Sequence, residues 1–167
     1  MFAILLCLPL VAENLGVITP PVERLRLDLG VPGTVVLQFA FASRARKRRI
    51  DLSDSANVVY TGTHDNDTSI GWWASAGAST RDAVEKALSR AAISESDPNW
   101  KMIRLALVHP ASLAIITVQD LLGLDSSARL NHPGTVRGNW MRQMALEALT
   151  PALAWRLREL TIAAARA

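Results

Sequence analysis

The sequence predicts an α/β fold of the barrel type, and three observations support this prediction. Apolar runs that are typical of strands buried on both faces alternate with segments of helical spacing. Two of the runs, Leu8–Ala12 and Val58–Tyr60, lead into the acidic residues Glu13 and Asp65. In such barrels the carboxyl ends of the strands carry the chemistry. A chain of 167 residues is short for eight strands and helices, which take about 250 residues, so we expect an incomplete barrel.

The expected strands and helices follow from local signals. Apolar and β-branched runs predict four strands, at residues 5–12, 34–41, 57–62 and 113–118. Cap residues, prolines and helical periodicity predict helices at residues 20–29, 79–95, 99–108 and from 150 to the C-terminus.

Composition excludes several classes of protein. Half of the residues are hydrophobic and 20% are charged, which is typical of a globular chain and not of a disordered one. The net charge of +3 is too small for a general attraction to nucleic acid. Cys7 is the only cysteine, so no intrachain disulfide is possible and a cytoplasmic location is the default expectation.

The first twelve residues are apolar and end on a small residue, as a signal peptide does. They lack the basic segment of a signal peptide, however, and they are shorter than the roughly 20 residues that span a membrane. We therefore favour a barrel strand and expect no membrane partner, with a signal peptide as the alternative.

A basic run, Arg44 to Arg49, lies in the connection at residues 42–56. Five like charges without interleaved aromatic residues favour a solvated, flexible loop over a nucleic-acid-binding patch. We expect no nucleic-acid partner, although the patch remains an alternative interpretation.

The segment after the third predicted strand is the first candidate for a site. His64 and Asp65 follow the apolar run directly, at the end of the strand where a pocket is expected. The alternative is an Asp/Asn-rich turn in which Asp67 or Thr68 caps the next helix. Two indoles follow at 72 and 73, and adjacent helical positions allow at most one of them to face the pocket.

Two other polar residues are expected to be structural. Gln38 is the lone polar residue of its run, and we expect its side chain to be hydrogen-bonded inside the barrel. Asp120 follows the fourth predicted strand and is expected to bond nearby backbone groups.

Four short segments carry a resemblance to a known family: AENLG at 12–16, YTGTHDND at 60–67, RLNHPGT at 129–135 and GNW at 138–140. In order and spacing they closely resemble the 4-alpha-glucanotransferases called amylomaltases or disproportionating enzymes. The resemblance implies the carboxy-terminal half of a (β/α)8 TIM barrel, with residues 1–167 forming a single partial catalytic domain. It also implies maltooligosaccharides or α-1,4-glucans as partners, and no metal or organic cofactor.

The resemblance implies roles for five residues. Glu13 is the general acid/base, and Asp65 is the carboxylate that stabilises the oxocarbenium-like transition state. His64 binds sugar hydroxyls, and Asn131 and Trp140 are glucan contacts. His132 receives no role, because the family has a small residue there. Asn14 replaces an Asp of the family motif, so Glu13 lacks a neighbouring charge that would favour its protonated form, and we expect a poorer proton donor.

The implied activity is transfer of α-1,4-glucan segments between maltooligosaccharides by a retaining mechanism. By the same resemblance, the nucleophilic Asp belongs to a strand that would precede residue 1, so we expect the chain alone to be inactive. The alternatives are a non-catalytic glucan-binding remnant and another glycoside hydrolase acting on α-glucans.

Overall fold

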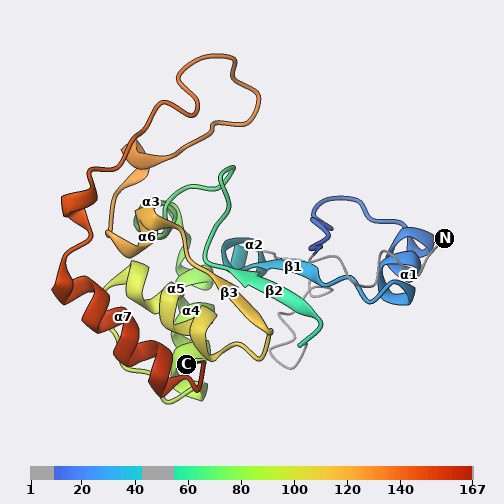
Figure 1. Ribbon diagram of the computed structural model, residues 1–167, viewed down its shortest axis with the longest axis horizontal. Helices are drawn as coiled ribbons and strands as arrows, with labels where there is room; N and C mark the ends of the chain where they lie inside the picture. The colour runs from blue at the N-terminus through green and yellow to red at the C-terminus, as the bar shows by residue number, and fades with distance from the viewer. Residues whose placement is uncertain (1–9, 43–54, 167) are drawn as a thin grey trace.

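The computed structural model describes residues 10–42 and 55–166. At its centre is a parallel sheet whose strands are β1 (Gly33–Val36), β2 (Asn57–Tyr60) and β3 (Leu113–Ile115), in that spatial order (Figure 1). Each strand therefore pairs with the next strand along the chain, as in a barrel. A doubly wound sheet would instead reverse its strand order. The described part is thus an α/β fold with a parallel sheet of three strands.

Helices precede, connect and follow the strands. The α-helices are α1 (Pro20–Asp28), α2 (Leu37–Ala42), α3 (Ser69–Ser75), α4 (Ala78–Arg90), α5 (Pro98–Val108), α6 (Val118–Leu121) and α7 (Pro151–Ala163). Two 3-10 turns are η2 (Ser126–Ala128) and η3 (Leu146–Ala148). Proline opens α1, α5 and α7, because it lacks the N–H that the first helical turn leaves unbonded. The predicted helix starts at 20, 99 and 150 are confirmed to within one residue.

Helix α5 is buried on two faces and so joins two parts of the hydrophobic core. One part connects β2, α2, α4 and α5, with Val59 and Met102 fully buried. The other lies between α5 and α7 and contains Trp100, Ile103 and Leu107, the face that the sequence spacing predicts. Each large apolar side chain buried in this way contributes about 1.5–3 kcal/mol. The helix therefore fixes α7 relative to the sheet.

The strand prediction for residues 34–41 is wrong beyond Val36, where α2 begins. A short apolar run fits a buried helix as well as a buried strand, and periodicity alone does not separate them. The predicted fourth strand is also shorter, because Thr117 caps α6 by accepting a hydrogen bond from the Asp120 N–H at 3.3 Å.

The first predicted strand, residues 5–12, lies mostly outside the described residues, and residues 10–12 do not form a strand. Most of the basic connection at 42–56 and Cys7 also lie outside the described part of the chain. Four predicted strands therefore become three in the described residues.

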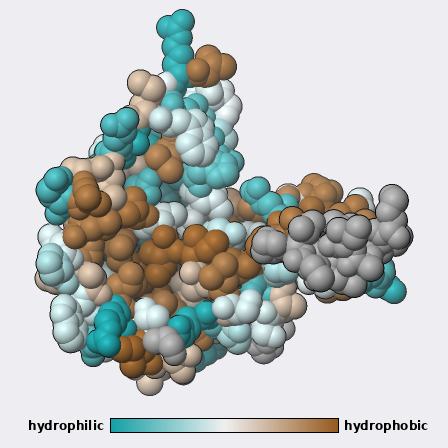
Figure 2. Space-filling view, in the orientation of Figure 1, coloured by the Kyte–Doolittle hydropathy of each residue, from teal (hydrophilic) through white to brown (hydrophobic). Residues whose placement is uncertain are grey.

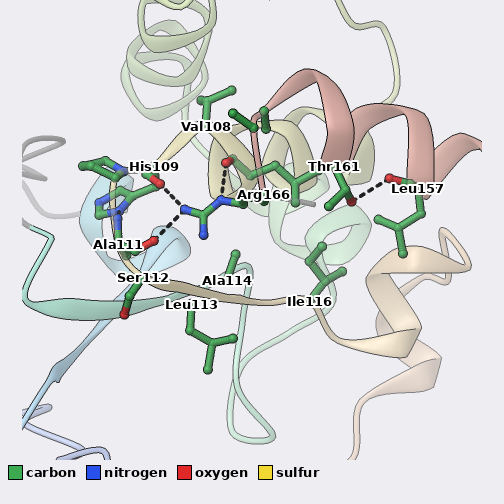
Figure 3. A pocket seen from close by; sticks show the side chains of 14 residues that line it. Val108, His109, Ala111, Ser112, Leu113, Ala114, Ile116, Leu157, Thr161 and Arg166 are labelled. Carbon is green, nitrogen blue, oxygen red and sulfur yellow. Dashed lines mark hydrogen bonds between the residues drawn. The ribbon is translucent and has the colours of Figure 1, made fainter.

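The amino end of β3 is tied to the end of α7 by one side chain. The guanidinium of Arg166 donates hydrogen bonds to the carbonyl oxygens of Leu107, His109 and Ala111 (Figure 3). These residues line an open cavity of about 640 Å³ between β3 and α7. Figure 2 shows hydrophobic surface across the middle of this face, around β3, where Leu113 is 49% exposed. None of the described helices is long and apolar enough to cross a membrane.

Asp120 holds the start of α3. Its side chain is 1% exposed, and Oδ1 accepts a hydrogen bond from the backbone N–H of Ser69 at 2.6 Å. This outcome agrees with the structural role predicted for Asp120.

We predict that Asp120→Ala lowers the free energy of unfolding by about 2–3 kcal/mol, because a buried hydrogen bond to a charged group is lost. Urea denaturation followed by circular dichroism measures the change. Asp82→Ala is the control: this carboxylate pairs with Lys86 at an exposed surface, and its loss should cost less than about 0.5 kcal/mol. Equal losses in the two variants would contradict the role of Asp120.

Candidate active site

The candidate site is built on the loop that follows β2. Thr61 and Gly62 are buried as the chain leaves the sheet. The side chain of Gln38 lies so close that a Cβ on Gly62 would be 2.9 Å from its Nε2, which explains the glycine. Gln38 Nε2 donates to the backbone oxygen of Asp67 at 2.7 Å. Gln38 thus makes the structural hydrogen bond that was predicted for it, although from α2 and not from a strand.

The second half of this loop caps α3. Thr68 Oγ1 accepts a hydrogen bond from the N–H of Gly71, and Asn66 Oδ1 accepts from the N–H and hydroxyl of Thr63. Asp67 Oδ1 accepts a hydrogen bond from the Thr68 N–H, and Asp67 Oδ2 accepts one from the Ser126 hydroxyl, both at 2.8 Å. Of the two cap residues that the alternative interpretation names, Asp67 and Thr68, it is Thr68 that caps α3.

His64 and Asp65 do not take part in the cap but face the loop that follows η2. His64 Nε2 lies 3.4 Å from Asp65 Oδ1, and the same oxygen accepts a hydrogen bond from Asn131 Nδ2 at 2.5 Å. The side chains of His64 and Asp65 are 44% and 43% exposed, so solvent or a ligand can reach both. Residues about 65 positions apart in the sequence thus form one polar group.

Trp140 completes this group with an aromatic face. Its ring centroid lies 5.2 Å from that of His64, with the planes inclined by 37°. Its backbone has φ 60°, an uncommon conformation for a bulky residue, and its N–H donates to the carbonyl of Leu130 at 2.7 Å. Asn139 holds the intervening loop by accepting from the His132 N–H and donating to the Thr135 carbonyl. An exposed indole held in an unfavourable backbone conformation is typical of a binding site.

Arg129 also belongs to the group, although the sequence analysis gave it no role. Its Nη2 donates to the backbone oxygen of Asp65 at 3.0 Å. The available signal was its place in the same motif as Asn131, two residues before it. Four of the five predicted site residues and Arg129 thus lie together: His64, Asp65, Asn131 and Trp140.

Glu13 is not joined to this group. The N–H of Ala12 donates to the carbonyl of Pro32 at 2.8 Å, and Asn14 Oδ1 accepts from the N–H of Thr34. Residues 12–14 therefore lie beside the first half of β1, and no hydrogen bond or ion pair links Glu13 to Asp65. The predicted strand at residues 5–12 lies mostly outside the described residues, so the expectation that Glu13 follows the carboxyl end of a strand stays a prediction.

Both indoles at 72 and 73 pack against the main hydrophobic core. Lys101 Nζ lies 4.9 Å from the centroid of the Trp73 ring. The expectation that at most one of the two faces the pocket therefore holds, and the indole that lies beside His64 is that of Trp140.

Two cavities lie at opposite ends of the sheet. A cavity of about 20 Å³, the size of one water molecule, is lined by His64, Asp67, Thr117 and Arg129, among others. The much larger cavity beside Arg166 lies at the amino end of β3. We assign the site to the carboxyl end, where parallel α/β barrels carry their functional side chains. Among the described residues, no three His, Cys, Asp or Glu side chains gather as metal ligands.

Comparison with known proteins gives a consistent result. The sequence model of one family, described as 4-alpha-glucanotransferase, matches residues 5–148. The 4-alpha-glucanotransferase of Thermus thermophilus is 40% identical over 164 residues, which cover 95% of this chain and 33% of the relative. The chloroplastic/amyloplastic enzyme of rice, Oryza sativa subsp. japonica, is 42% identical over 156 residues, covering 90% of this chain and 26% of the relative.

The fold agrees with these matches. The amylomaltase of Streptococcus agalactiae, solved in complex with acarbose, superposes with a TM-score of 0.86 at 30% identity. The match covers 95% of this chain and 32% of the amylomaltase. The chain thus spans about a quarter to a third of the length of the relatives it matches.

A titration tests the position of Glu13. Burial raises the pKa of Tyr60, and the negative charge of Glu13 raises that pKa further. Tyr60 is the only tyrosine in the chain, so the ultraviolet absorbance of tyrosinate reports it alone. We predict that Glu13→Gln lowers the pKa of Tyr60, whereas Glu147→Gln, at an exposed position on η3, does not.

The sign of the linked stability effect follows from the raised pKa. The folded chain holds the Tyr60 proton more tightly than the unfolded chain, so the contribution to stability is full below about pH 10 and is lost as pH rises through the folded pKa. An unchanged titration in Glu13→Gln would show that residues 12–14 lie elsewhere in solution.

Proposed function

Because the chain belongs to the 4-alpha-glucanotransferase family, we propose that it contributes part of the active site for transferring α-1,4-glucan segments between maltooligosaccharides. The observation that carries the proposal is the group of His64, Asp65, Asn131 and Trp140 at the carboxyl end of the sheet. It combines a carboxylate, an imidazole and an exposed aromatic face, which are the groups a sugar ring requires.

We propose that Asp65 binds sugar hydroxyls and stabilises the transition state of a retaining reaction. In such a reaction positive charge develops on the sugar ring, and hydrogen bonds to its hydroxyls strengthen as the charge grows. Asp65 supplies a partly exposed carboxylate for this purpose, and His64 supplies a ring nitrogen beside it. Their mutual contact orders both side chains before a glucan binds.

Trp140 supplies the apolar part of the contact. A flat aromatic face stacks on the C–H surface of a glucose ring, while the hydroxyls at the ring edge keep polar partners. The indole is 62% exposed and tilted against His64, so a ring stacked on it would lie close to Asp65.

Glu13 remains our proposed general acid/base, on the strength of the family motif alone. That role requires its carboxylate to reach the same glycosidic bond as Asp65. The charge of Glu13 acts on Tyr60, the last residue of β2, so residue 13 lies near the carboxyl end of that strand.

We also propose that β1, β2 and β3 are consecutive strands in the carboxy-terminal half of a (β/α)8 barrel. Their parallel pairing in chain order supports this assignment, as does the similarity to amylomaltase. Residues 1–167 would then form one partial catalytic domain.

Two tryptophans of equal exposure allow a matched test of glucan binding. Trp140 is 62% exposed beside His64, and Trp155 is 61% exposed on α7. We predict that Trp140→Ala weakens binding of maltoheptaose about tenfold, because the stacking surface is lost. Trp155→Ala should bind as the parent does. Calorimetric titration measures both, and equal affinities in the two variants would contradict the proposal.

A transfer assay tests the catalytic roles. We predict that the chain alone forms no glucose or longer oligomers from maltotriose, because transfer with retention needs a nucleophile that forms a glucosyl intermediate. Activity should appear when the part of the Thermus thermophilus relative that precedes the matched region is added. In that mixture, Asp65→Asn and Glu13→Gln should each lower the rate by several orders of magnitude.

The assay also separates the alternatives. Products from the chain alone would contradict the proposed mechanism. Binding of maltoheptaose without transfer in any mixture would favour a glucan-binding remnant. Chromatography of the oligomers gives the readout, with His132→Ala as the control variant, because His132 is exposed and bonds Asn139 and Thr135 through its backbone.

A further inference from the structure

Asn131 contacts Asp65 more closely than any other side chain in the site. We propose that Asn131 is a positioning residue, which fixes the carboxylate of Asp65 by holding Oδ1 and leaves Oδ2 for a ligand. This differs from the role of a direct glucan contact that the sequence suggests. Only the identity of the ligand at Oδ2, a sugar hydroxyl, rests on the proposed function.

The bonds of Asp65 distinguish its two carboxylate oxygens. Its N–H donates to Thr63 Oγ1 at 3.3 Å, and its backbone oxygen accepts from Arg129 at 3.0 Å. Oδ1 accepts from Asn131 at 2.5 Å and lies 3.4 Å from His64 Nε2. Within the described chain no hydrogen bond reaches Oδ2. The backbone and one oxygen are thus fixed, while the other oxygen is left for an incoming donor.

Neighbouring residues of one segment make these contacts. Arg129 bonds the backbone oxygen of Asp65, and Asn131 bonds its Oδ1. Between them, the carbonyl of Leu130 accepts the N–H of Trp140. The same three residues therefore fix the backbone of Asp65, its carboxylate and the adjacent indole.

The amide of Asn131 is needed because the loop does not bury Asp65. A carboxylate that is 43% exposed can rotate about its side-chain bonds, and a second contact is required to select one rotamer. A hydrogen bond to the ionised form also favours that form over the protonated one. Removing the amide should therefore both loosen the side chain and make it easier to protonate.

Three other charged or titratable groups surround Asp65, and none of them replaces Asn131. His64 lies beside Oδ1, and the Arg129 guanidinium bonds the backbone oxygen. Both oxygens of Asp67 are bonded to other partners. These groups are retained in the Asn131 variants, so a change in the titration of Asp65 reports the lost amide.

The first experiment is independent of any glucan. The carboxyl carbon of Asp65 is followed by NMR in the full chain as pH is lowered, with Asp65→Asn to assign the signal. In Asn131→Ala the midpoint should rise, because the lost bond is to a charged but partly exposed group. Asn131→Leu, which has a side chain of similar size without a donor, should show the same rise.

His132→Ala is the matched control in the same loop and should leave the midpoint unchanged. Circular dichroism checks that each variant is folded, and Asn131→Leu keeps the test valid if Asn131→Ala is not. Midpoints equal to that of the parent in a folded Asn131 variant would overturn the proposal.

The second experiment measures maltoheptaose affinity against pH by calorimetry. A positioning role predicts that acid weakens binding at a higher pH in Asn131→Leu than in the parent. A direct glucan contact predicts an equal loss of affinity at every pH, which would overturn the proposal. If the parent binds no maltoheptaose, the proposed function fails, while the NMR titration still decides whether Asn131 positions Asp65.

Discussion

The position of Asp65 depends on how the loop at residues 63–68 and the start of α3 are fixed. The loop has no regular secondary structure to satisfy its backbone groups, so side chains from other elements must do so. Gln38 on α2 and Ser126 on η2 bond Asp67 in this loop, and Asp120 on α6 bonds Ser69 at the start of α3. Segments along most of the described chain therefore converge on one loop. The site cannot form until these elements have packed, which makes the fold a precondition for the chemistry.

The sequence predicted the helices better than the strands, and the reason is local. Helix starts carry cap residues and prolines, and α7 begins after Thr150, whose hydroxyl accepts from the N–H of Leu153. Strands are recognised only by their apolar content, which a buried helix shares. The run at residues 34–41 was therefore predicted as one strand, although β1 ends at Val36 and α2 begins at the next residue.

The site was predictable as a set of residues but not as a set of bonds. The motifs indicated His64, Asp65, Asn131 and Trp140, and the structure brings them together from two distant segments. No pattern in the sequence shows that Asn131 would bond Asp65 and not a ligand, because a side-chain amide serves either purpose. The place of residue 13 was not predictable either, since it depends on whether residues 10–12 enter the sheet.

Counting hydrogen bonds separates the functional carboxylate from the structural ones. Asp67 uses both oxygens within the fold, and Asp120 is 1% exposed, so neither can meet a ligand. Asp65 alone of the three combines a bonded oxygen with an exposed and unbonded one. All three follow apolar runs, and position in the sequence does not rank them. The number of donors around each carboxylate ranks them. Two donors bond both oxygens of Asp67, whereas the amide of Asn131 bonds only one oxygen of Asp65.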